Sequence, residues 1–131
     1  MIGIDTNVLL RLWLNDDPEQ AEAITKLLTP YQSQIHGILI NDLVLVEAVW
    51  VLRSVYGQSK AAIVDVLRRT LAEPAYRFDD RTIAESAVAA FEDCNADFSD
   101  CLIAAKNAAS DCDFTATFDR AMGPLPGIKV L

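Results

Sequence analysis

Short apolar runs alternate along this chain with longer segments in which apolar residues recur at helical spacing. The runs predict strands over residues 2–4, 35–40, 76–78, 113–117 and 128–131. The longer segments predict helices over 6–14, 17–28, 42–57, 59–72, 80–92 and 97–110. Regular alternation of strand and helix is typical of an α/β domain with a mainly parallel sheet.

Residues that start or stop helices mark several of these boundaries. Pro18 suits a first helical turn, and Asn41 is a favourable N-cap for the helix that ends at Gly57. Ser59 is a further N-cap. Pro30 predicts that the second helix stops before it, because proline lacks the N–H that a helix interior uses.

Composition fits a single globular domain. The chain has 131 residues, of which 52% are apolar and 23% charged, and it shows no repeat or linker, so we expect one domain over 1–131. Its most apolar stretch, 43–52, is much shorter than the roughly 20 residues of a membrane span. The start of the chain lacks the basic and apolar regions of a signal peptide, so we expect a cytoplasmic protein.

Cysteine and histidine usage excludes several kinds of site. Cys94, Cys101 and Cys112 form no CxxC pair, which favours reduced thiols that pack as small hydrophobic side chains. His36 is the only histidine. Zinc sites built from His and Cys, and nucleophiles activated by histidine, are therefore not expected.

The charge balance is strongly acidic. The chain carries 19 Asp and Glu against 11 Lys and Arg, a net charge of −8. This argues against a broad basic face for nucleic acid, because phosphates are normally contacted by clustered Lys and Arg. Two interpretations remain: nucleic acid is not the ligand, or metal cations lie between the acidic residues and the phosphates.

Acidic residues follow several predicted strands. Asp5 follows the first strand, and Asp119 follows the fourth. Glu47 lies in the helix after the second strand, and Asp97 and Asp100 open the helix before the fourth. Ligands of open parallel sheets bind beyond the carboxyl ends of the strands, which lie about 4.8 Å apart. These carboxylates are therefore expected to converge.

Each acid also has a purely structural interpretation. Asp5 can cap the following helix, Asp97 and Asp100 resemble a capping box, and Asp119 can be an ordinary turn residue. Glu47 lies in a helix that is apolar nearly all round, so we expect it to be largely buried. A buried carboxylate needs a partner, and a distant arginine could supply one.

Taken together, the acids favour a bound cation. Two unit charges at 4 Å repel by about 4 kcal/mol at an effective dielectric constant near 20, so a cluster of carboxylates is costly without one. Oxygen ligands without histidine favour the hard ions Mg²⁺ or Mn²⁺.

The segments that carry these acids resemble those of a known family. They are the opening Asp5-Thr6-Asn7-Val8-Leu9-Leu10-Arg11, the helical Glu47, Ala96-Asp97-Phe98-Ser99-Asp100, and Thr115-Ala116-Thr117-Phe118-Asp119-Arg120. As a set over the whole chain, they resemble PIN-domain ribonucleases, and most of all the VapC toxins of type II toxin-antitoxin systems.

The resemblance implies a fold, an activity and a set of site residues. The fold is a PIN-like three-layer sandwich around a mainly parallel five-stranded sheet of order 3-2-1-4-5. The activity is Mg²⁺- or Mn²⁺-dependent hydrolysis of RNA, leaving 5′-phosphate and 3′-hydroxyl ends, by a toxin that a cognate antitoxin neutralises and that forms a homodimer. The catalytic and metal-binding quartet falls on Asp5, Glu47, Asp100 and Asp119, with Asp97 as a further metal ligand, Thr6, Asn7 and Thr117 in support, and Arg11, Lys106 and Arg120 as RNA contacts.

Other functions are weighed against this one. A haloacid-dehalogenase-like phosphatase would carry a second Asp where Asn7 stands, and a receiver domain would need an acidic pair after its first strand. The main alternative is a catalytically weak binding module of the same fold that acts through a protein partner. In either case an antitoxin helix is expected in an apolar groove, for which the candidates are Leu9, Leu12, Trp13, Trp50 and Tyr56, although ordinary core packing also explains them.

Overall fold

The computed structural model describes residues 1–131, which form two compact units, Met1–Asp79 and Asp80–Leu131. Helices and parallel strands occur in both units, so the predicted α/β class is confirmed. No helix is long and apolar enough to cross a membrane.

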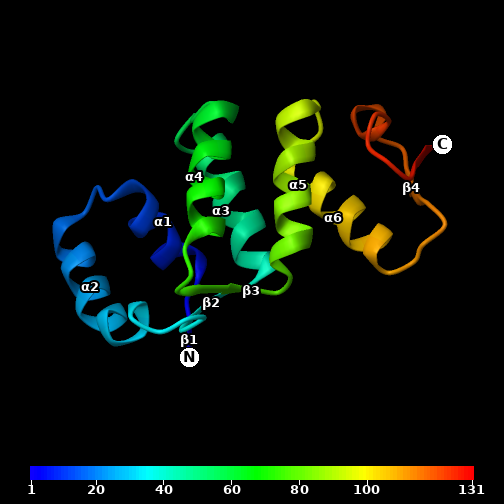
Figure 1. Ribbon diagram of the computed structural model, residues 1–131. Helices are drawn as coiled ribbons and strands as arrows, with labels where there is room; N and C mark the ends of the chain where they lie inside the picture. Colours follow the sequence, from blue (N-terminus) through cyan, green and yellow to red (C-terminus); the bar gives the residue numbers. More distant parts are fainter. The chain divides into compact units, whose positions relative to one another are not determined.

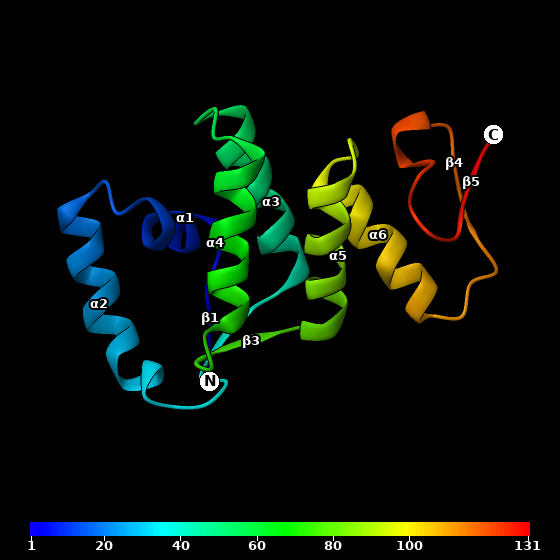
Figure 2. The same ribbon diagram turned by 45° about the horizontal axis from the view of Figure 1, so that its top comes forward.

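The first unit is built on a three-stranded parallel sheet. Strand β2 (Ile38–Ile40) lies between β1 (Ile2–Gly3) and β3 (Tyr76–Phe78), so β3 is an edge strand of this sheet. Helices α3 and α4 run side by side in both ribbon views (Figures 1 and 2). The four helices of this unit are α1 (Thr6–Leu14), α2 (Pro18–Gln32), α3 (Asp42–Ser54) and α4 (Lys60–Ala72).

The core of the first unit joins the central strand to its helices. Ile38 and Ile40 are fully buried, and their helical counterparts Leu9, Leu28 and Leu67 are too. Burying a side chain of this size stabilises the fold by about 1.5–3 kcal/mol. A partly buried hydrogen bond, in which the Trp13 indole N–H donates to Thr70 Oγ1 over 2.9 Å, adds a polar link between α1 and α4.

The second unit pairs two helices with two strands. Helix α6 runs obliquely to α5, and strands β4 and β5 lie side by side (Figures 1 and 2). Phe91 and Phe98 meet edge to face between the helices, with ring centroids 5.9 Å apart. The Asn107 side-chain amide donates to Thr115 Oγ1 over 3.0 Å and so links α6 to β4. The elements are α5 (Arg81–Asp93), α6 (Phe98–Ala109), β4 (Thr115–Thr117), a 3₁₀ turn (Arg120–Met122) and β5 (Ile128–Val130).

Strand neighbours agree with the predicted order within each sheet. Strand β2 pairs with β1 and β3, and β4 pairs with β5, all in parallel. The structure describes these as two separate sheets. A single five-stranded sheet of order 3-2-1-4-5 therefore stays a prediction.

Several predicted boundaries are wrong. The helix predicted to end at Gly57 ends at Ser54, with Val55 as its C-cap. Helix α2 continues through Pro30 to Gln32, although proline cannot donate the hydrogen bond to the preceding turn that a helix interior uses. Strand β2 starts at Ile38 rather than at Ile35, because Ile35 is 80% exposed and His36 has a positive φ of 58° that breaks an extended run.

Candidate acidic site

Asp5 stands directly after β1 and caps α1. Its carboxylate accepts a hydrogen bond from the Val8 backbone N–H over 3.0 Å, which satisfies one of the unpaired donors at the start of the helix. The capping interpretation of Asp5 is therefore confirmed, and a second carboxylate oxygen is left for another role. Thr6 and Asn7 follow it in the first turn, half-buried and exposed respectively.

Glu47 is exposed, so the prediction of a buried carboxylate is wrong. Helix α3 buries only one face, made by Val44, Leu45, Ala48, Val49 and Leu52. Leu43 and Trp50, one turn before and after Glu47, are 81% and 62% exposed. An apolar composition on every side of a helix thus does not require burial on every side. Because the Glu47 side chain is exposed, its carboxylate needs no arginine partner to offset burial.

Asp100, in the first turn of α6, is the centre of an acidic cluster in the second unit. Partial burial raises the pKa of the Asp100 carboxyl above its ordinary value. A hydrogen bond from the Asp97 backbone lowers this pKa, whereas the negative charges of Asp97 and Asp119 raise it again. Asp97 and Asp119, which belong to two different segments, therefore each lie close enough to Asp100 to disfavour its negative charge.

Asp97 precedes α6 as its N-cap residue, yet its side chain makes no capping hydrogen bond. The carboxylates of Asp17 and Asp80, by contrast, each cap their helix by accepting from the backbone N–H three residues on. The predicted capping box is therefore only half formed, since only Asp100 bonds back to the Asp97 backbone. Capping does not explain the presence of Asp97.

Asp119 is held in a tight turn after β4. Its backbone N–H donates to Thr117 Oγ1 over 3.0 Å, and its carboxylate accepts from the Ala121 N–H over 2.9 Å. The turn interpretation of Asp119 is confirmed, and the Thr117 hydroxyl helps to hold this turn. Its supporting role at the site stays a prediction. Phe118, between them, is 83% exposed.

The three predicted RNA contacts differ in their surroundings. The Arg11 guanidinium forms a salt bridge with Asp16 over 2.5 Å, and this partner raises the pKa of Arg11. Lys106 lies in the last turn of α6, and Arg120 is exposed in the 3₁₀ turn directly after Asp119. Arg120 is therefore the basic residue nearest in sequence to a candidate site acid.

The donor chemistry fits a hard divalent cation, since carboxylate oxygens are the ligands that Mg²⁺ and Mn²⁺ prefer. Within each unit, no group of three or more His, Cys, Asp or Glu side chains is arranged so that it could hold a metal ion. The repulsion at Asp100 is nevertheless the kind of strain that a bound cation relieves. Convergence of all five acids stays a prediction.

The predicted antitoxin groove is partly wrong. Leu9 is fully buried and belongs to the core, and the Trp13 indole is tied to Thr70. Trp50 and Tyr56 are 62% and 42% exposed, as a docking surface requires. Sequence reasoning also missed Asp16 as the partner of Arg11. The left-handed Asn15 that ends α1 turns the chain so that these side chains meet, and an Asn before two Asp residues was the available signal.

Comparison with known proteins gives one family. A model of the PIN domain family, described as "PIN domain", matches residues 2–125, nearly the whole chain and both units. No curated protein matches the chain. The chain therefore belongs to the PIN domain family, whose nuclease-type fold generally carries metal-dependent hydrolysis of RNA.

Proposed function

We propose that this protein is a Mg²⁺- or Mn²⁺-dependent endoribonuclease of the VapC toxin type. The observation that carries the proposal is the cluster of Asp97, Asp100 and Asp119, in which burial and like charges raise the pKa of Asp100. Folded proteins are stabilised by only about 0.05–0.15 kcal/mol per residue, so repulsion between carboxylates is a noticeable cost to the fold. A bound cation would remove this cost, and the cluster therefore favours a cationic ligand. Membership of the PIN family supports the same chemistry.

The proposed site combines acids from both ends of the chain. Asp5, Glu47, Asp100 and Asp119 are the proposed catalytic quartet, and Asp97 is a further ligand. A divalent cation bound there supplies an activated water and neutralises charge on the scissile phosphodiester. Thr117 fixes the backbone of Asp119, and the Asp97 N–H fixes the carboxylate of Asp100. Asp5, Asp100 and Asp119 are thus oriented by hydrogen bonds before a ligand arrives.

Positive charge for the RNA backbone would come from a few basic residues. Arg120 follows Asp119 directly and is exposed, which supports a phosphate contact beside the site. Lys106 on α6 is the second candidate. Arg11 already binds Asp16, so it would have to exchange this partner for a phosphate.

Cleavage of a fluorescent single-stranded RNA tests the activity. We expect cleavage with Mg²⁺ or Mn²⁺ that chelation abolishes, and products with 5′-phosphate ends. Asp100→Asn and Asp5→Asn are each expected to slow cleavage on the order of 10²-fold or more, because each removes a charge that binds the cation.

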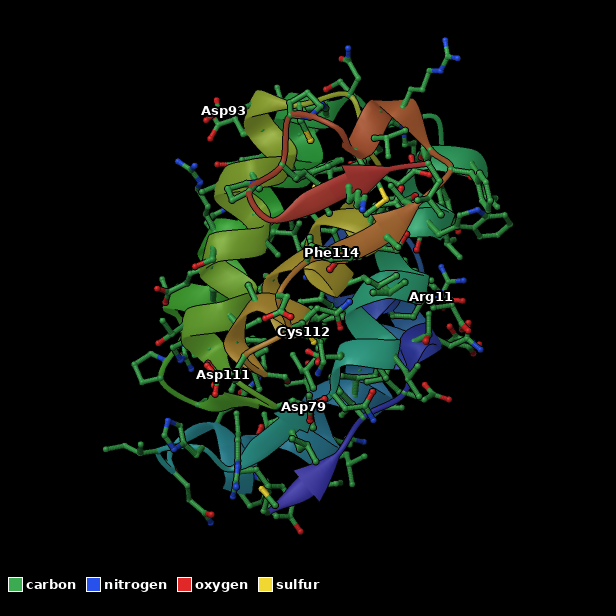
Figure 3. All side chains as sticks on the ribbon, turned by 90° about the vertical axis from the view of Figure 1, so that its right-hand side faces the viewer. Arg11, Asp79, Asp93, Asp111, Cys112 and Phe114 are labelled. Carbon is green, nitrogen blue, oxygen red and sulfur yellow. The ribbon has the colours of Figure 1, made fainter.

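Asp111→Asn is the matched control. Asp111 is exposed and follows the far end of α6, and Figure 3 shows it beside Cys112. The same exchange there removes one negative charge and leaves the proposed ligands intact, so cleavage at the wild-type rate is expected. If Asp100→Asn and Asp5→Asn also cut at the wild-type rate, the site assignment is wrong.

The toxin role adds a protein partner. We propose that an amphipathic antitoxin segment docks on the exposed side chains Trp50 and Tyr56 of the first unit, with Leu43, exposed on the same helix as Trp50, as a further contact. Exposed apolar side chains of this size favour a partner surface. Homodimerisation is proposed on the family resemblance alone. Co-purification of a small protein encoded next to this gene would support the toxin role over that of a housekeeping nuclease.

The alternative is a binding module of the same fold without turnover. It predicts partner binding that persists in Asp100→Asn, and no RNA cleavage by the wild type with either metal. The cleavage experiment above therefore separates the two functions.

A further inference from the structure

Two cysteines of the second unit lie in contact. The Sγ atoms of Cys94 and Cys101 are 3.6 Å apart, a distance at which either thiol can donate to the other. Cys94 ends α5 and is half-buried, whereas Cys101 lies in α6 and is 1% exposed. None of the three cysteines forms a disulfide in the structure, and Cys112 is exposed.

The two thiols differ in their access to a small reagent. Cys94 is reached from solvent. Cys101 forms part of the wall of a groove of about 370 Å³ between α5 and α6, which Ile83, Ala104, Ala108 and Leu125 also line. The half-buried thiol is therefore the one open to attack, and the buried thiol is held next to it.

We propose that Cys94 and Cys101 form a reversible intramolecular disulfide when the protein meets a hydroperoxide. The Cys94 thiol attacks the peroxide, its sulfur takes up one oxygen as a sulfenic acid, and the other oxygen leaves as water or an alcohol. The Cys101 thiol then attacks the Cys94 sulfur, an S–S bond forms, and the sulfenic oxygen leaves as water. Two thiols are oxidised and one peroxide bond is reduced.

The geometry makes the second step easy. A disulfide bond measures about 2.05 Å, so the sulfur atoms must approach by roughly 1.5 Å. Cys101 is packed in the core of the unit, whereas Cys94 follows the last turn of α5 with an extended backbone, φ −132° and ψ 174°. The movement therefore falls mainly on Cys94 and the segment after it.

The segment closed by this disulfide contains two proposed metal ligands. Asp97 lies between the cysteines, and Asp100 precedes Cys101 directly. Because the Asp97 N–H bonds the Asp100 carboxylate, a shift of the 95–97 segment displaces both acids together. On the proposed nuclease function, the reduced protein is then the active form, and the oxidised protein cleaves RNA slowly.

Peptide mass measurement tests the modification directly. Trypsin cuts after Arg81, Lys106 and Arg120, so Cys94 and Cys101 share the peptide 82–106 and Cys112 lies alone in 107–120. After stoichiometric hydrogen peroxide, the peptide 82–106 of the wild type is expected to lose two hydrogens, about 2 Da, and to resist alkylation until it is reduced. Cys94→Ser and Cys101→Ser are each expected to lose this product, and Cys112→Ser is expected to keep it.

Activity is the second measurement. Oxidised wild type and oxidised Cys112→Ser are expected to cut RNA at least on the order of tenfold more slowly, with recovery after dithiothreitol, because a shift of about 1 Å at a catalytic group is costly. Cys94→Ser is expected to resist this loss. The inference is overturned if peptide 82–106 stays fully alkylatable while Cys112 is oxidised, or if the oxidised protein cuts RNA as fast as the reduced protein does. A wild type without any nuclease activity would instead refute the proposed function, and the mass measurement would still decide whether the disulfide forms.

Discussion

Asp97 and Asp100 lie in one turn of the chain but relate to α6 in different ways. Asp100 accepts a hydrogen bond from the Asp97 backbone, whereas the Asp97 side chain makes none of the capping bonds that its position offers. The carboxylates of Asp5 and Asp119 do cap their turns. Each of these caps uses one carboxylate oxygen, so Asp5 and Asp119 can cap a turn and still offer an oxygen to a ligand. Asp97, at a helix start without a capping bond, is the N-cap acid that capping leaves unexplained.

The raised pKa of Asp100 gives a prediction about stability and pH. A carboxyl whose pKa is raised by folding binds its proton more tightly in the folded state, so its ionisation destabilises the fold as pH rises through the window just above its ordinary value. Without metal, Asp100→Asn is expected to raise the free energy of unfolding at about pH 7 by roughly 0.2–1 kcal/mol, since the group is partly exposed. The gain is expected to vanish at about pH 3.5, where the wild-type carboxyl is protonated as well.

Urea unfolding of the metal-free proteins at both pH values measures this effect. Asp111→Asn serves as the control. Asp111 is exposed, and it is not among the residues whose charges act on Asp100. A stabilisation by Asp100→Asn of equal size at both pH values would contradict the electrostatic explanation.

Single residues also show what the sequence could not supply. The positions of Asp5, Asp97, Asp100 and Asp119 beyond strands or at helix starts were predictable from local signals. The exposure of Glu47 was not, because the sequence shows that α3 is apolar all round but not which face has a partner. Burial of a side chain depends on the packing of distant segments.

At the scale of elements, helix starts follow one chemical rule. Asp5, Asp17, Asn41, Ser59 and Asp80 each accept a hydrogen bond from a backbone N–H in the first turn of the helix that they precede. This explains why most helix starts were predicted to within a residue. Helix α6 is the exception, since Asp97 makes no such bond.

A pair of alanine substitutions tests this difference. Asp80→Ala removes a capping bond of 3.0 Å to the Ile83 N–H and is expected to lower the free energy of unfolding by about 1 kcal/mol. Asp97→Ala removes none and is expected to change it by less than about 0.5 kcal/mol. Urea denaturation compares the two, and RNA cleavage is expected to fall only for Asp97→Ala.

The opposite pattern would be informative. If Asp97→Ala destabilises the protein as much as Asp80→Ala and leaves cleavage unchanged, Asp97 is an ordinary cap and its proposed ligand role is wrong.

Strands were predicted less sharply than helices. Strand β2 lacks residues 35–37 of its predicted range, and β4 starts at Thr115 instead of Asp113. A strand exists only where a neighbour pairs with it, and Ile38 is the first residue of its run with partners on both sides, Ile2 and Tyr76. Its ends are therefore decided by the neighbouring strands.

At the scale of the whole molecule, the net charge of −8 fits the proposed function. Setting aside Asp5, Glu47, Asp97, Asp100 and Asp119 leaves 14 acids against 11 bases, a much milder balance. If these five acids bind cations, RNA meets a locally positive site on an acidic protein. Binding of RNA should then depend on divalent cations more than on basic side chains.

Removal of divalent cations tests this dependence. In Ca²⁺, which accepts oxygen ligands without strict octahedral geometry, the protein is expected to bind a short fluorescent RNA at least on the order of tenfold more tightly than after chelation, at equal ionic strength. Fluorescence anisotropy measures the affinity. Equal affinity with and without Ca²⁺ would show that basic side chains alone hold the RNA.

By itself, the sequence determined the α/β class, the order of elements, most helix starts and the residues that carry the family resemblance. These follow from local physics: apolar periodicity, capping side chains, and residue types placed next to strands. The tertiary structure alone decided that Glu47 and Trp50 are exposed, that Leu9 is core, that Arg11 binds Asp16, and that Cys94 meets Cys101. Exposure and side-chain contacts depend on which segments pack against each other. Local sequence patterns do not fix this packing, because it involves residues that the folded backbone brings together.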